Sequence, residues 1–237
     1  MYKTAAEAGD FCRRLRKAWP GNAGVEVAVF PPYTALAAAV TELAGSGIQV
    51  GAQNLHPAAS GAFTGEISAG MLLTLGCTGV IIGHSERRHV LGESDDFCAE
   101  KVVSASQAGL VPVFCVGETL AERQGGKTEA VVSRQLSGVL KQLQEPGRLV
   151  VAYEPVWAIG TGITATPALA QEVHRFIRKT LAGVWGSKGE AVRILYGGSV
   201  KPENARELLS KPEVNGALVG GASLEVEPFV SIVKAAI

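Results

Sequence analysis

The chain has 237 residues, of which 47% are hydrophobic and 19% charged, and its formal net charge is zero. This composition is apolar enough for a large buried core and excludes a disordered chain. Lys and Arg form no long block, so neither nucleic acid nor a membrane is expected as a partner. The expected partner is a small-molecule substrate. Because we find no apolar run of about 18 residues and no secretory signal, we expect a cytoplasmic protein.

Four cysteines are spread along the chain, and none forms a C-x-x-C pair. Their wide spacing suggests neither a zinc site nor a redox motif, so no metal or cofactor is expected. They are predicted to be small, buried, reduced residues. These cysteines are Cys12, Cys77, Cys98 and Cys115.

The first predicted element is an amphipathic helix. Thr4 and Glu7 match a capping box, and Phe11 and Leu15 follow at helical spacing. An apolar run at residues 25–30, closed by two prolines, predicts the first strand of this sequence, and residues 34–43 predict a second helix.

Six further strands are predicted from short, continuously apolar runs, which are typical of strands covered on both faces. Helical patterns lie between them. One of these patterns opens with Thr166 and Pro167, a cap and a first-turn proline. The predicted strands are residues 48–52, 79–83, 110–116, 148–153, 192–196 and 216–220.

This alternation gives seven strands and about eight helices and predicts one α/β domain over residues 1–237. The economical fold is a (β/α)8 barrel whose first strand is absent from this sequence. An open, doubly wound sheet is the alternative. That fold usually carries its Gly-rich loop after the first strand, whereas the paired glycines here follow the last two strands.

Two residues at predicted strand ends could carry acid–base chemistry. His84 precedes a predicted helix start, whose partial positive charge favours a neutral ring that can donate a hydrogen bond. Glu154 precedes an apolar loop, and desolvation there would raise its pKa toward that of a base working near neutral pH. Taken singly, each could instead be structural. Structural roles are expected for the other histidines, His56, His89 and His174.

Paired glycines follow the last two predicted strands, at residues 197–198 and 220–221. Glycine lets backbone N–H groups approach an anion closely, and a helix start adds its dipole. Either pair alone is compatible with a plain turn. Two pairs in neighbouring loops favour a phosphate site.

Four motifs together resemble the triosephosphate isomerase family, and the resemblance covers the chain from Tyr2 onward. They are G-A-F-T-G-E at residues 61–66, G-H-S-E-R-R at 83–88, A-Y-E-P-V-W-A-I-G-T-G at 152–162 and Y-G-G-S-V at 196–200. The resemblance implies a TIM barrel of glycolysis and gluconeogenesis. Such an enzyme interconverts D-glyceraldehyde 3-phosphate and dihydroxyacetone phosphate through an enediolate.

The resemblance also implies a role for each candidate residue. Glu154 would remove the proton from the carbon next to the carbonyl, and His84 would polarise the carbonyl and move protons between the two oxygens. A lid over residues 155–162 would close on the substrate and exclude water. The phosphate would be bound by backbone N–H groups of Gly160, Ser199, Gly220 and Gly221.

A homodimer is implied as well, made by a long loop at residues 53–68 that inserts into a neighbouring subunit. This loop runs from Gln53 to Ser68. From its residues alone, the loop leaves open whether Phe63 is a contact with another chain or a plug in the core.

The sequence departs from the family pattern before Met1, where relatives have an apolar strand ending in Asn-x-Lys. Lys3 lies beyond the matching position, beside the cap of the first helix, and is not expected to replace the lysine. Glu86 would lose its lysine partner, and activity would be strongly impaired. Ile163 stands where many relatives have a hinge lysine, which bears on lid motion. A start set at an internal methionine and a genuine truncation both stay open.

Two other functions remain as alternatives. The first is a catalytically inert phosphate-binding or assembly module on the same scaffold. The second is a different barrel enzyme that shares the phosphate loops, such as a synthase of the tryptophan or histidine pathways. The motif at residues 152–162 argues against the second.

Overall fold

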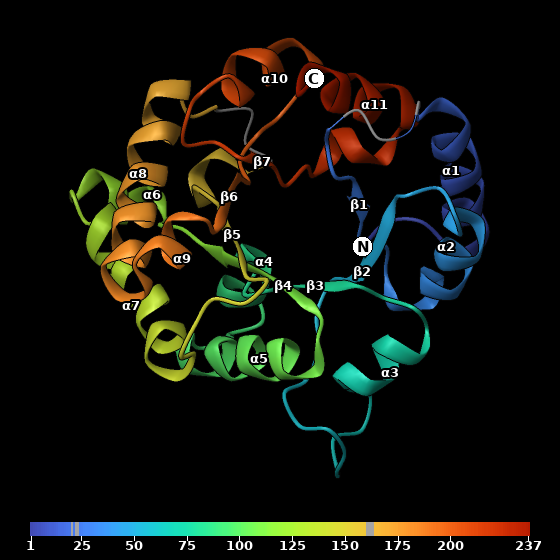
Figure 1. Ribbon diagram of the computed structural model, residues 1–237, viewed down its shortest axis with the longest axis horizontal. Coiled ribbons are helices and arrows are strands. Elements are labelled where there is room, and N and C mark those ends of the chain that lie inside the picture. The colour runs from blue at the N-terminus through green and yellow to red at the C-terminus, as the bar shows by residue number, and fades with distance from the viewer. Residues whose placement is uncertain (20, 22–23, 160–163) are drawn as a thin grey trace.

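The computed structural model describes residues 1–19, 21, 24–159 and 164–237, and it shows a ring of helices around a curled sheet (Figure 1). Seven strands form the sheet within these residues. They are β1 (Ala28–Val29), β2 (Gln49–Ala52), β3 (Gly79–Ile82), β4 (Val111–Val116), β5 (Val150–Tyr153), β6 (Arg193–Tyr196) and β7 (Gly216–Ala217).

All neighbouring strands are parallel, and each pairs with the next one along the chain. This unbroken order is that of a barrel wall. A doubly wound sheet reverses its order at a switch point, so that alternative is wrong. Among the described residues β1 pairs only with β2 and β7 only with β6, which leaves two open edges.

Helices follow the strands and cover the outer face of the sheet (Figure 1). The described residues contain eleven α-helices and three short 3-10 helices. The α-helices are α1 (Ala5–Ala18), α2 (Leu36–Leu43), α3 (Ala69–Thr74), α4 (Ser85–His89), α5 (Asp95–Ala108), α6 (Leu120–Gln124), α7 (Thr128–Gln142), α8 (Pro167–Trp185), α9 (Ser187–Glu190), α10 (Pro202–Leu209) and α11 (Val226–Ala235). The 3-10 helices are η1 (Tyr33–Ala35), η2 (Val156–Ala158) and η3 (Gly221–Leu224).

Local signals placed the helix starts correctly. The Thr4 hydroxyl accepts the N–H of Glu7, and the Glu7 carboxylate accepts the N–H of Thr4 at 2.7 Å, so the predicted capping box begins α1. Thr166 likewise caps α8, with Pro167 in its first turn. The predicted number of helices was too low because single βα connections contain two helices, as α4 and α5 do.

The predicted outer strands were too long. Residues 25–30 yield only Ala28–Val29 in β1, and residues 216–220 yield only Gly216–Ala217 in β7. A strand at an open edge has backbone hydrogen bonds to a neighbouring strand on one side only. The prolines after β1 have no N–H and cannot extend these hydrogen bonds. Inner strands kept their predicted residues to within one or two positions, as with Val111–Val116 in β4.

Side chains on both faces of the sheet are buried, as continuous apolar runs require. One face packs against the helices and belongs to the main core, which includes Phe114 and Tyr153. The other face holds a smaller cluster inside the curl of the sheet: Ile81, Val113, Cys115 and Ala152. All four cysteines are buried and unbonded to one another, as predicted.

In the part of the chain that the structure describes, every helix is too short or too polar to cross a membrane.

His174 on α8 is the one histidine with no exposed surface in the described residues. Its ring lies edge-on to Tyr153, with centroids 5.9 Å apart, and Nδ1 lies 3.1 Å from the carbonyl oxygen of Glu213. Among described groups its Nε2 has no hydrogen-bond partner. Burial lowers the pKa of His174 to about 4, because a charged ring would lose its hydration and its Nε2 proton would have no acceptor. The carbonyl oxygen of Glu213 at Nδ1 opposes this shift only in part.

We expect acid to destabilise the fold through His174. In the unfolded chain its pKa is near 6.5, so the unfolded state takes up a proton first, and stability is lost as the pH falls from 6.5 through 4. The full loss is about 3 kcal/mol. Urea unfolding at pH 7, 5.5 and 4.5 should show a shallower pH dependence for His174→Asn, and equal slopes for both proteins would contradict this.

Candidate active site

His84 lies at the carboxyl end of β3 and caps α4. Its Nδ1 accepts the backbone N–H of Glu86 at 3.3 Å. A ring nitrogen that accepts a hydrogen bond carries no proton, so this contact leaves the proton of the neutral ring on Nε2. A neutral His84 ring then presents its N–H on the opposite side, where Glu154 lies.

Glu154 follows β5 directly and is almost fully buried, with 2% of its surface exposed. Its Oε1 lies 3.2 Å from Nε2 of His84, and its Oε2 accepts the backbone N–H of Ser85 at 2.9 Å. The structure thus brings together the two residues that sequence reasoning selected, from strands that are 70 residues apart in the chain.

Burial is the largest influence on Glu154 and raises its pKa. A charged His84 ring and the N–H of Ser85 act in the opposite direction, and both favour the ionised carboxylate. A carboxylate that ionises at a higher pH than usual, next to an N–H donor, can take a proton from carbon while the donor bonds an oxygen.

The loop after β6 is shaped around this carboxylate. A Cβ atom on Gly197 would lie 2.7 Å from Cγ of Glu154, so only glycine fits at this position. The N–H of Ser199, predicted to bind phosphate, donates to the carbonyl oxygen of Ala158 at 3.1 Å. An anion that binds this N–H has to break that bond.

The second glycine pair lies in more open surroundings. A Cβ atom on Gly220 or Gly221 would meet nothing within 4 Å. Among the described residues, no protein group accepts from their N–H groups, which stand at the start of η3. This is the arrangement that an anion needs. The remaining predicted phosphate residue, Gly160, and the hinge residue Ile163 lie outside the described residues.

The first part of the predicted lid packs against the protein. Ala158 is fully buried, and Trp157 is partly buried with its Nε1 donating to Oε1 of Glu118 at 3.0 Å. The apolar stretch after Glu154 is therefore not an exposed loop in this structure, because Glu118 and the core supply its partners.

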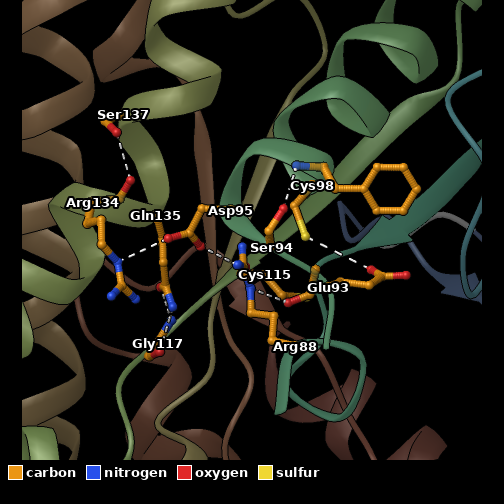
Figure 2. Close-up of polar contacts among 12 residues, drawn as sticks. Arg88, Glu93, Ser94, Asp95, Cys98, Cys115, Gly117, Arg134, Gln135 and Ser137 are labelled. Atoms are coloured by element: carbon orange, nitrogen blue, oxygen red, sulfur yellow. Dashed lines mark hydrogen bonds and ion pairs between the residues drawn. The ribbon is translucent and has the colours of Figure 1, made fainter. Parts of the chain in front are cut away.

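Arg88 supports the site, and sequence reasoning missed it. Its guanidinium donates to the carbonyl oxygen of Gly83 at 2.8 Å and to that of Cys115 at 3.2 Å, and it pairs with Asp95 (Figure 2). It thus ties the residue before His84 to β4. The only signal in the sequence was its place in G-H-S-E-R-R.

The lysines and other histidines stand apart from this pair. Lys3 lies over the ring of Phe11, 5.1 Å from the centroid, and within the described residues no lysine pairs with the exposed Glu86. His56 packs against Phe63, and His89 ends α4. In the described ranges no three His, Cys, Asp or Glu side chains gather where they could hold a metal ion.

A curled, all-parallel α/β sheet with a carboxylate and an imidazole 3.2 Å apart at its carboxyl edge is the framework of an α/β-barrel enzyme. The family model for triosephosphate isomerase matches residues 1–236. The chain belongs to the triosephosphate isomerase family.

Close relatives carry the same name. The triosephosphate isomerase of Carboxydothermus hydrogenoformans is 53% identical, and the match covers 100% of this chain and 96% of the relative. That of Moorella thermoacetica is 54% identical over 99% of this chain and 94% of the relative. That of Thiobacillus denitrificans is 53% identical over 100% of this chain and 95% of the relative.

Glu154→Gln should stabilise the fold at alkaline pH. Because the folded-state pKa is raised, the protonated form favours folding, and this stability is lost as the pH rises through the folded pKa. The amide can still accept the N–H of Ser85 without a buried charge. We expect a gain of about 1 kcal/mol at pH 8 in urea unfolding. The gain should vanish near pH 4, and a variant less stable at pH 8 would contradict this.

Proposed function

We propose that the chain interconverts D-glyceraldehyde 3-phosphate and dihydroxyacetone phosphate. The observation that carries the proposal is the 3.2 Å approach of Glu154 Oε1 to His84 Nε2, with Nδ1 of the same ring occupied as an acceptor. A carboxylate base beside a neutral histidine is the known pairing of this enzyme family.

In the proposed reaction, Glu154 takes the proton from the carbon next to the carbonyl. The C–H electron pair forms the C=C bond of an enediolate, and the negative charge develops on the former carbonyl oxygen. His84 donates Nε2–H to that oxygen and passes a proton between the two oxygens. Glu154 then returns its proton to the neighbouring carbon, so no external oxidant or cofactor takes part.

The phosphate is proposed to bind at the glycine loops. Two observations support this. Among the described residues no group accepts a hydrogen bond from the N–H of Gly220 or Gly221, and the space around both glycines is open. Ser199 and Gly160 complete the proposed set, with Ser199 changing its partner from Ala158 to the phosphate. Closing of the lid over residues 155–162 would then exclude water.

We further propose that an eighth strand, outside the described residues, closes the sheet between β7 and β1. The two open edges support this, because a buried edge leaves N–H and C=O groups unpaired. The family's Asn-x-Lys segment would arrive on that strand and bring a cation to the substrate.

We also propose a single domain over residues 1–237, located in the cytoplasm. The single domain is supported by one main core that takes in residues from Phe11 to Val233.

The turnover prediction concerns the chain extended by an apolar strand ending in Asn-x-Lys, which the open edges of β7 and β1 can accept. In a coupled assay, we expect this extended version to interconvert the two triose phosphates. In the extended version, Glu154→Asp should lower kcat by about 100-fold, because the carboxylate retreats by about 1 Å. The exposed Glu172→Asp, on α8, is the matched control and should change little.

Two outcomes would overturn this function. Binding of inorganic phosphate without turnover in the extended chain would favour an inert phosphate-binding module. Equal kcat values for Glu154→Asp and Glu172→Asp would show that Glu154 is not the base of the reaction.

We also propose a homodimer through the loop at residues 53–68. This loop leaves the body between β2 and α3 and projects outward (Figure 1). Phe63 in this loop is 47% exposed, and further exposed apolar side chains lie at Met71, Val90 and Leu91. An exposed set of this kind is typical of a surface that another chain covers.

Changing Phe63 to Asp should dissociate the dimer, because a charge would be buried without a partner. Light scattering after size exclusion should then report a monomer. Val184→Asp, on an exposed position of α8, is the control and should stay dimeric. If the unsubstituted protein is monomeric at every concentration tested, the dimer proposal is wrong.

A further inference from the structure

Gln135 is a buried amide on α7, with 2% of its surface exposed. Both ends of its side chain bond one residue, Gly117, which follows β4. The N–H of Gly117 donates to Oε1 at 2.7 Å, and Nε2 donates to the carbonyl oxygen of Gly117 at 3.1 Å (Figure 2). A carboxamide offers one acceptor and one donor side by side, so it pairs with a backbone as a neighbouring strand would.

Gly117 lies directly against the backbone of Glu154. A Cβ atom at position 117 would come within 1.8 Å of the carbonyl oxygen of Glu154, so no other residue fits there without a shift. On either side, Val116 accepts the N–H of Glu154 at 2.7 Å and Glu118 accepts the N–H of Val156 at 3.1 Å. Residues 116–118, here called the 116–118 segment, therefore support Glu154 and the start of the lid.

The side chain of Glu118 adds a second connection from this segment. It is fully buried and accepts the Tyr153 hydroxyl at 3.1 Å and Nε1 of Trp157 at 3.0 Å. The 116–118 segment thus contacts the residue before Glu154, Glu154 itself and the first helical turn of the lid. Its own position is set from the other side by Gln135.

We propose that Gln135 is a positioning residue for the isomerase reaction. By holding both polar groups of Gly117, it fixes the 116–118 segment and through it the carboxylate of Glu154 and the Trp157 end of the lid. The kinetic part of this inference rests on the proposed function. Its alternative is that Gln135 only satisfies two buried backbone groups and supports the fold.

The first test compares Gln135→Met with Val139→Ala in the extended chain. Both sites are buried on α7, one turn apart, and Val139 is a purely apolar core residue. We expect Gln135→Met to lower kcat by 10- to 100-fold and to change KM less than threefold, because the base is displaced while phosphate contacts persist. Val139→Ala should keep kcat within twofold. Equal kcat values for the two variants would overturn the inference.

The second test measures the pH dependence of kcat in Gln135→Glu. It keeps the inference testable if Gln135→Met fails to fold. An ionised carboxylate accepts the N–H of Gly117 but repels its carbonyl oxygen, whereas a protonated acid restores one donor and one acceptor. Burial raises the pKa of an unpaired acid, so protonation should occur at mild pH. The kcat of this variant relative to the unchanged chain should rise at least fivefold from pH 9 to pH 6. A flat ratio would overturn the inference.

A third measurement does not need turnover. Hydrogen exchange of the amides of Glu154 and Val156 should be at least tenfold faster in Gln135→Glu at pH 9 than in Val139→Ala. Absence of activity in the unchanged, extended chain would refute the proposed function alone. Unchanged exchange at these two amides would refute the positioning role.

Discussion

The buried carboxylate of Glu154 has two polar neighbours: Nε2 of His84 lies 3.2 Å from Oε1, and the backbone N–H of Ser85 donates to Oε2. An ionised group without such neighbours would be neutralised by its surroundings. Both neighbours come from the turn after β3, while the carboxylate follows β5, with β4 between them. The parallel arrangement of these three strands is what brings all their carboxyl ends to one edge.

The supports of the pair share one physical feature, which is the use of side chains to satisfy backbone groups where the sheet ends. Arg88 donates to the carbonyl oxygens of Gly83 and Cys115, and Gln135 bonds both the N–H and the carbonyl oxygen of Gly117. Past the last ladder bond a strand no longer fixes its neighbour. Long polar side chains from the following helices take over that task.

Much of this architecture could be predicted from local patterns. Continuous apolar runs gave the seven strands, Thr4 and Thr166 marked helix starts, and the strand-end positions of His84 and Glu154 selected the pair. Contacts over long separations could not be predicted. Gln135 lies 18 residues from Gly117. Its spacing from Val131 and Val139 places it on the buried face of α7, but no local pattern shows which backbone groups its amide bonds. The short lengths of β1 and β7 could not be predicted from local patterns either, because they depend on the absence of a neighbouring strand at each edge among the described residues.

The bond between the Ser199 N–H and the carbonyl oxygen of Ala158 joins the loop after β6 to η2, and the proposed phosphate would compete for the same N–H. One donor cannot serve both acceptors at full strength. The measured affinity for any anion that uses this N–H therefore contains the free energy of releasing η2 from the loop after β6. By reciprocity, substitutions in η2 that never touch a ligand would alter ligand affinity, and the occupied and empty states would differ in their distribution of loop conformations.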